Sequence, residues 1–151
     1  MTIKVFSIEK VKKDNYYDII SSYKKMISRY SNIEDIPLFN KQIAISQNIS
    51  QRDAQKSYTD IFLKRMGKYN IVLDPLGKEI DSFVFSRLFE DKSEISFFIG
   101  GAYGFEKEFV KKNDLVISLS RLTMSHKIAK IVLYEQIYRA FSIMNNHPYH
   151  K

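Results

Sequence analysis

The sequence predicts an α/β protein built on one mostly parallel sheet. Short runs rich in β-branched and aromatic residues alternate along the chain with longer runs whose apolar residues recur every three or four positions. The 151 residues match the length of one domain, and neither an internal repeat nor a Pro/Gly/Ser-rich linker divides them. We therefore expect a single domain, residues 1–151, in which five strands alternate with five helices.

The first part of the chain predicts a strand, a helix and a second strand. Thr2–Ile8 is an apolar run of β type, and Asp14 can cap a helix whose apolar positions extend to Tyr30. The run Ile36–Ile45 is also strand-like, but it contains Pro37, which has no N–H for a sheet ladder. We therefore expect this strand to lie near an edge of the sheet or to start late.

The remaining elements continue the alternation. Ser50 and Asp53 resemble a capping box, and Gly67 closes the helix that follows them. The strand Tyr69–Leu73 leads into a turn sequence, Asp74–Gly77. The later elements are a short helix capped by Asp81, a strand Glu94–Ile99, a helix Phe105–Lys112, a strand Leu115–Leu119 and a long helix from about Lys127 to Asn145.

Composition excludes several classes of protein. The chain has no cysteine, so it holds no disulfide framework, zinc-thiolate site or cysteine nucleophile. It has no apolar run of about 18 residues and no signal-peptide pattern, so we expect no membrane contact and a cytoplasmic location. The formal net charge is +7, and residues 1–30 hold seven bases against three acids. A basic excess at both ends of the chain fits contact with nucleic acid, although simple solubility explains it equally well.

Three loops follow predicted strands, at the edge where parallel sheets bind ligands. They are Leu73–Gly77, Gly100–Gly104 and Ser118–His126. Glycine in the second loop allows close approach of a ligand to the main chain, but a tight turn without a ligand is the simpler interpretation. The loop matches neither a dinucleotide fingerprint nor a P-loop.

The histidines and the last helix leave alternatives open. His126, His147 and His150 could together bind zinc, but Pro148 makes the segment extended and we expect no metal. In the last helix, Glu135 and Arg139 stand four residues apart, either as a solvated ion pair or with Glu135 orienting Arg139 toward an anionic site. The apolar stripe of this helix is predicted to comprise Ile128, Ile131, Val132, Tyr138 and Phe141.

Four segments, taken together and in order, resemble the RlmH-type SPOUT methyltransferases. They are Phe97–Gly104, Leu119–His126, Tyr134–Ser142 and the ending Asn146–Lys151. The resemblance implies an α/β knot, with a five- to six-stranded sheet and a C-terminal trefoil knot. It also implies a homodimer that uses S-adenosyl-L-methionine to methylate N3 of pseudouridine 1915, in helix 69 of 23S rRNA, on the assembled ribosome.

The resemblance also assigns expected roles to individual residues. His150, His147 and Glu135 are the candidates for a general base, while Arg139 and Lys151 would bind phosphate or stabilise negative charge. Tyr149 could stack on the exposed base. The expected cofactor contacts are Leu73, Gly100, Gly101, Ser120, Arg121, Leu122, Thr123, Met124 and Ser125. The competing interpretation is a non-catalytic RNA- or ribosome-binding factor with a degenerate cofactor loop.

Overall fold

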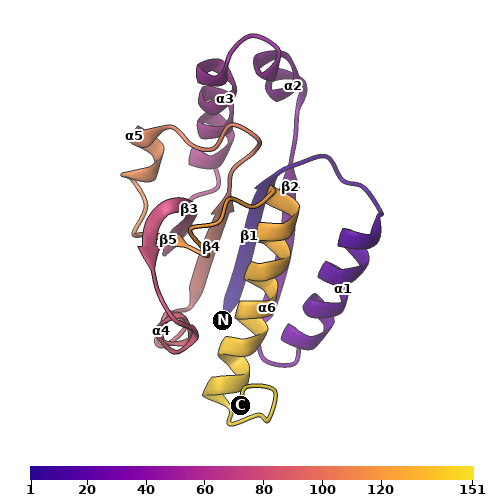
Figure 1. Ribbon diagram of the computed structural model, residues 1–151, viewed down its shortest axis with the longest axis vertical. Helices are drawn as coiled ribbons and strands as arrows, with labels where there is room; N and C mark the ends of the chain where they lie inside the picture. The colour runs from indigo at the N-terminus through magenta and orange to yellow at the C-terminus, as the bar shows by residue number, and fades with distance from the viewer.

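The computed structural model describes residues 1–151 and contains one five-stranded sheet with every neighbouring pair parallel (Figure 1). The strand order is β2-β1-β4-β3-β5. This confirms the expected α/β class and the parallel sheet, while the trefoil knot stays a prediction. The strands are β1 (Thr2–Ile8), β2 (Asn32–Leu38), β3 (Asn70–Glu79), β4 (Glu94–Ile99) and β5 (Leu115–Ser118).

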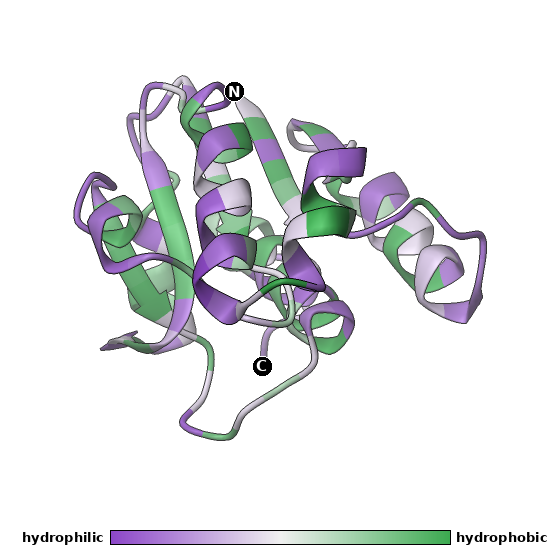
Figure 2. Ribbon diagram, turned by 90° about the horizontal axis from the view of Figure 1, so that it is seen from above, coloured by the Kyte–Doolittle hydropathy of each residue, from purple (hydrophilic) through white to green (hydrophobic).

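Helices cover both faces of the sheet. One core packs α1, α4 and α6 against residues such as Ile3 and Val5 of β1, and the other packs α2, α3 and α5 against Phe6 and Ile8 of the same strand. In Figure 2 the hydrophobic stretches gather where helices meet the sheet, and hydrophilic residues occupy the outer turns. The helices are α1 (Asn15–Ile27), α2 (Lys41–Gln47), α3 (Gln51–Leu63), α4 (Ser82–Arg87), α5 (Lys107–Val110) and α6 (His126–Met144).

Three of the predicted helix starts are confirmed by side-chain caps. The carboxylate of Asp14 accepts from the Tyr17 N–H at 3.0 Å, and Asp81 accepts from the Val84 N–H at 2.7 Å. The Ser50 hydroxyl oxygen accepts from the Asp53 N–H at 3.0 Å. Each cap satisfies a donor that has no partner inside the helix. None of the helices combines the length and apolar character that a membrane span requires.

The predicted strand Ile36–Ile45 is right only for its first three residues, and β2 already begins at Asn32. Strand β2 ends at Leu38, and Asn40 then caps α2 by accepting from the Ile43 N–H at 2.8 Å. The Asn40 side chain provides a hydrogen-bond acceptor for an N–H at the start of the helix. This favours a helix here, although the residues that follow Asn40 have a composition typical of strands. The expected edge position is confirmed, since β2 pairs only with β1 and its residue Pro37 is tolerated there.

Strand β3 also differs from its prediction. The strand leaves its ladder after Leu73 and returns at Lys78, and both residues pair with Ile117 of β5. The residues between them form the expected turn, in which Asp74 accepts from the Leu76 N–H at 2.8 Å. Gly77 passes so close to Ile117 that a Cβ atom would lie 2.7 Å from its carbonyl carbon. The strand therefore continues to Glu79 with a bulge at the sheet's carboxyl edge.

The last two predicted helices are only partly right. Helix α5 shrinks to Lys107–Val110, and on α6 the predicted apolar residue Ile128 is exposed. Helix α6 lies between α1 and α4 on the sheet, so it is buried on several sides. Its buried face is therefore wider than the predicted apolar stripe and is centred on different residues. The fully buried apolar residues of α6 with no exposed surface are Leu133, Tyr134, Ile137 and Ala140.

Candidate active site

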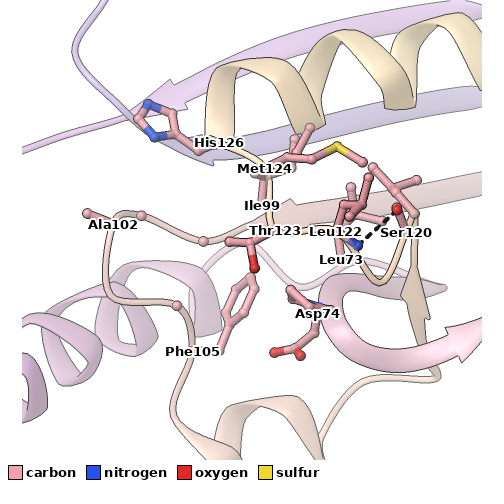
Figure 3. A pocket seen from close by; sticks show the side chains of 16 residues that line it. Leu73, Asp74, Ile99, Ala102, Phe105, Ser120, Leu122, Thr123, Met124 and His126 are labelled. Atoms are coloured by element: carbon pink, nitrogen blue, oxygen red, sulfur yellow. Dashed lines mark hydrogen bonds between the residues drawn. The ribbon is translucent and has the colours of Figure 1, made fainter.

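A cavity of about 210 Å³ opens at the carboxyl edge of β3, β4 and β5. All three loops that follow these strands contribute to it, together with the first turn of α6. Figure 3 shows their side chains gathered around one space, with His126 and Ser120 toward opposite ends of the view. The lining residues are Leu73, Asp74, Pro75, Ile99, Gly100, Gly101, Ala102, Gly104, Phe105, Leu119, Ser120, Leu122, Thr123, Met124, His126 and Ala129.

Two of the nine expected cofactor residues lie outside the cavity lining. Arg121 points away, with its side chain 88% exposed and its Nε 3.7 Å from a carboxylate oxygen of Glu79. Ser125 instead caps α6, where its hydroxyl oxygen accepts from the Ile128 N–H at 3.4 Å. The structure places the other seven in the cavity wall: Leu73, Gly100, Gly101, Ser120, Leu122, Thr123 and Met124.

The glycine loop, residues 100–104, is held from behind by helix α3. A Cβ atom on Gly101 would lie 2.7 Å from the buried Tyr58 ring, so the loop packs on that ring only because this residue is glycine. Gln55 donates from its side-chain amide to the Tyr103 carbonyl oxygen at 2.7 Å. Gly104 closes the turn with φ at 73°, a conformation that favours glycine. Two residues of α3, Tyr58 and Gln55, therefore fix the position of the glycine loop.

The lining chemistry suits a cationic nucleoside-type ligand better than a phosphorylated one. Asp74 is the one carboxylate among the lining residues, and no Lys or Arg lines the cavity. A carboxylate favours a neighbouring positive charge and repels a phosphate. The rest of the wall is largely apolar or small, as the site for an adenosine ring and a short chain would be. The residues present therefore fit the sulfonium cofactor that the resemblance implies.

His126 lines the cavity although the sequence reasoning did not include it in the cofactor site. Burial, the largest cause, lowers its pKa below the ordinary value, and nearby Lys127 and Lys130 lower it further. Glu9 acts in the opposite direction from 3.9 Å. The imidazole is therefore neutral at neutral pH. Its place directly after the third loop, at the start of α6, is the sequence signal that could have identified it.

The other missed lining residues have a shared explanation. Most lie in the same loop as a predicted contact or at the end of the adjoining strand, and Ala129 lies in the first turn of α6. Which of them line the cavity depends on the tertiary path of the chain. They are Asp74, Pro75, Ile99, Ala102, Gly104, Phe105, Leu119 and Ala129.

A second group of predicted residues forms one cluster at the C-terminal end of α6. The Arg139 guanidinium donates twice to Glu135 Oε1, from Nε at 3.0 Å and from Nη2 at 2.6 Å. The Tyr149 hydroxyl donates to the same oxygen at 2.9 Å, and the Arg139 guanidinium lies 4.9 Å from the centre of the Tyr149 ring. Arg139 Nη1 lies 3.2 Å from His150 Nδ1. We call these four residues the tail cluster.

Contacts within the tail cluster keep two of its members, Arg139 and Tyr149, protonated. Hydrogen bonding to Glu135 raises the pKa of Arg139, and burial followed by the bond to Glu135 raises the pKa of the Tyr149 hydroxyl. Both groups therefore remain protonated donors. A guanidinium has no acceptor, so His150 Nδ1 must accept from it. The ring of Tyr149 is held between Arg139 and Tyr138, whose ring centre lies 4.7 Å away, and it is not free to stack on a base in this arrangement.

The remaining tail residues lie beside the cluster. His147 Nδ1 accepts from the Tyr149 N–H at 3.2 Å, and the His147 N–H donates to the Ser142 carbonyl oxygen at 2.8 Å. Lys151 is exposed. His150 packs edge-on against Phe83 of α4, with ring centres 4.9 Å apart. These contacts fold the last residues back onto the end of α6 (Figure 1).

The cavity and the tail cluster lie at opposite ends of α6. His126 opens the helix at the cavity and Arg139 stands 13 residues later, which is about 20 Å at 1.5 Å per residue. Figure 1 shows the same separation, with the C-terminus at the far end of the helix from the loops. Within one chain His126 is likewise remote from His147 and His150, so the three histidines do not form one group there. One chain alone does not bring its two groups of predicted residues together.

Comparisons with known proteins identify the fold and the family. A solved structure from Bacillus anthracis, described as a putative RNA methyltransferase, shares the fold at a TM-score of 0.56 and 12% identity, covering 99% of this chain and 97% of that one. Proteins named "Ribosomal RNA large subunit methyltransferase H" from Aliarcobacter butzleri and Campylobacter jejuni are 49% and 46% identical over the full length of both chains. Residues 1–150 match the family model described as "Predicted SPOUT methyltransferase". With its glycine-lined cavity and its full-length relatives, this chain belongs to the SPOUT methyltransferase family.

Proposed function

We propose that this protein is an S-adenosyl-L-methionine-dependent rRNA methyltransferase. Its proposed target is N3 of pseudouridine 1915 in helix 69 of 23S rRNA, within the assembled ribosome. The observation that carries the proposal is a cavity with one carboxylate and no basic side chain, bounded by a glycine loop fitted to Tyr58. The names of the full-length relatives support ribosomal RNA as the substrate class.

The cofactor, when bound, supplies an electrophilic methyl group on a cationic sulfur. The three loops would hold it mainly through main-chain groups, since most of their lining residues are small or apolar. Asp74 contributes the negative charge that favours a sulfonium. Positioning of this methyl group against the attacking nitrogen supplies much of the rate, because in-line displacement depends on alignment of the reacting atoms.

The tail cluster would act on the base. The target nitrogen carries a proton and must lose it to become a nucleophile. Glu135 is poorly placed to receive that proton, because Arg139, Tyr149 and Gln136 already donate to its two oxygens. His150 has one polar contact, to Arg139, and we assign it as the base once that guanidinium turns toward the substrate. Arg139 would stabilise the negative charge that develops on the base oxygens.

The separation along α6 makes a homodimer part of this proposal. A second copy packed with opposed α6 directions would bring the tail cluster of one subunit to the cavity of its partner. The exposed apolar residues of the face shared by α1 and α6 suit such a contact, among them Tyr16 at 39%, Ile19 at 42% and Ile128 at 40% exposure. Two copies related by a two-fold axis would form two equivalent composite sites.

Two measurements test the function. Calorimetric titration with S-adenosyl-L-methionine should show saturable binding, whereas no binding at millimolar cofactor favours the non-catalytic ribosome-binding factor. Ribosomes from a strain that lacks this protein should then gain one methyl group in helix 69 when treated with protein and cofactor, as mass spectrometry of the excised fragment measures. Methylation of a short free hairpin at the same rate would contradict the assembled ribosome as the substrate.

A further inference from the structure

The loop between β1 and α1, residues 9–14, presents three lysines beside the cavity without any role in the proposed chemistry. Lys10, Lys12 and Lys13 are all exposed, and Val11 between them is 71% exposed. We call this segment the β1–α1 loop. An apolar residue this exposed in a short basic loop shows that the loop stands away from the core rather than packing on it.

The two acids of the β1–α1 loop do not neutralise these lysines. Glu9 pairs with the buried Lys130 at 3.1 Å, and Asp14 pairs with Lys127 at 2.7 Å, so both carboxylates are directed inward to α6. None of the nine ion pairs in the protein includes Lys10, Lys12 or Lys13. Lys10 Nζ lies 5.0 Å from the centre of the Phe39 ring, a contact that leaves its charge intact. The loop therefore presents three lysines without an ion-pair partner, while its two carboxylates anchor it to α6.

The anchoring places the β1–α1 loop at the cavity. Glu9 Oε2 lies 3.9 Å from Nε2 of His126, which lines the cavity wall. The loop follows β1 at the same carboxyl edge of the sheet from which the cavity opens (Figure 1). A polyanion that reaches the cavity from this side would pass over the three lysines.

We propose that the β1–α1 loop is a contact surface for the phosphate backbone of the RNA substrate. The proposal rests on the proposed function. It specifies which surface contacts the RNA backbone while the target base enters the cavity. Lysine on an exposed loop suits this role, because an ammonium group on a flexible side chain neutralises phosphates without reading sequence. Each neutralised phosphate on single-stranded RNA releases about 0.7 counterions. Three contacts therefore contribute about two to the slope of log affinity against log salt concentration.

A charge-matched pair of triple variants tests this surface. The test variant is Lys10→Ala/Lys12→Ala/Lys13→Ala, and the control is Lys64→Ala/Arg65→Ala/Lys68→Ala, which removes the same charge from exposed positions before β3, at the opposite edge of the sheet. Methylation of ribosomes is measured from low to high salt, with cofactor affinity measured by calorimetry. In the test variant we expect KM for ribosomes to rise about tenfold. This variant should also show a slope of log KM against log salt concentration that is smaller than in the wild type by about two. Its kcat and cofactor affinity should match the wild type, and the control should change less than about twofold.

Each other outcome overturns the proposal. A test variant that behaves like the control, or that keeps the wild-type salt dependence, shows that the lysines do not contact RNA. A test variant that sediments as a monomer shows that the loop contacts a second subunit instead. If the wild-type protein itself does not methylate ribosomes, the proposed function fails. If the wild type is active and the two triple variants are equal, this surface alone is wrong.

Discussion

The two ends of α6 achieve specificity in different ways. At the cavity end, glycines and small or apolar side chains from three loops make a wall with a single carboxylate. At the other end, four charged or polar side chains, two from α6 and two from the last residues of the chain, contact one another. In the proposed function, the first region binds cofactor through its shape and main chain, and the second acts on the substrate through side-chain charge. Substitutions should therefore affect binding at one end and turnover at the other.

The largest expected effect follows from removing the central group of the tail cluster. Arg139→Ala deletes the donor that contacts Glu135, His150 and the Tyr149 ring. Loss of a preorganised charge-stabilising donor lowers turnover by about 10²- to 10³-fold. Cofactor affinity, measured by calorimetry, should remain unchanged, because the cavity lies at the other end of the helix. A drop in cofactor affinity of similar size would show that the two ends are not separate.

The opposite pattern is expected at the glycine loop. Gly101→Ala places a methyl group 2.7 Å from Tyr58, whose side chain is fully buried and cannot withdraw, so the loop itself must shift. We expect cofactor affinity to fall at least about tenfold, which corresponds to roughly 1.4 kcal/mol. The matched control is Tyr103→Phe, an exposed position in the same loop that does not line the cavity, and this variant should bind cofactor normally. Equal affinity of both variants would refute the close fit of the loop.

Mixing these two variants tests whether the two ends meet between subunits. After unfolding and refolding together, equal amounts of Arg139→Ala and Gly101→Ala chains should recover about a quarter of wild-type turnover, because half of the dimers are mixed and each has one intact site. At limiting cofactor each variant alone retains about a tenth of wild-type turnover or less, as its expected loss of affinity or of turnover implies. If each site were built within one chain, the mixture would stay as inactive as its components.

The sequence predicted different features of the cavity end and of the tail cluster. The alternation of apolar runs was enough for the sheet and for caps such as Asp14, because these depend on local interactions. The positions of Arg121 and Ser125 were not predictable, because a loop residue faces inward or outward according to the tertiary path of its loop. The pair Glu135 and Arg139 was predicted from its four-residue spacing, and Tyr149 and His150 through family resemblance. The predicted long helix already separated this pair from the third loop, but the path of the tail back to Glu135 and Arg139 depends on tertiary contacts.

The smallest expected effect is a pH dependence that arises at the cavity end of α6, from protonation of His126. Burial lowers the pKa of His126 in the folded protein, so the unfolded chain, where the value is about 6.5, takes up a proton more readily. Stability should therefore fall as pH drops below about 6.5, and it should be insensitive to this group above that pH. A charged imidazole also opposes a cationic ligand in the same cavity.

Cofactor affinity should therefore weaken by about two- to threefold between pH 7.5 and pH 5.5, since the interacting charges remain partly solvated. Calorimetry across this range measures the change, and His126→Gln, which stays neutral, should abolish it. The turnover of bound complexes belongs to the tail cluster, so its pH dependence should survive in His126→Gln. If wild type and His126→Gln lose affinity equally at low pH, another group governs the cavity, and Asp74 is then the residue to substitute.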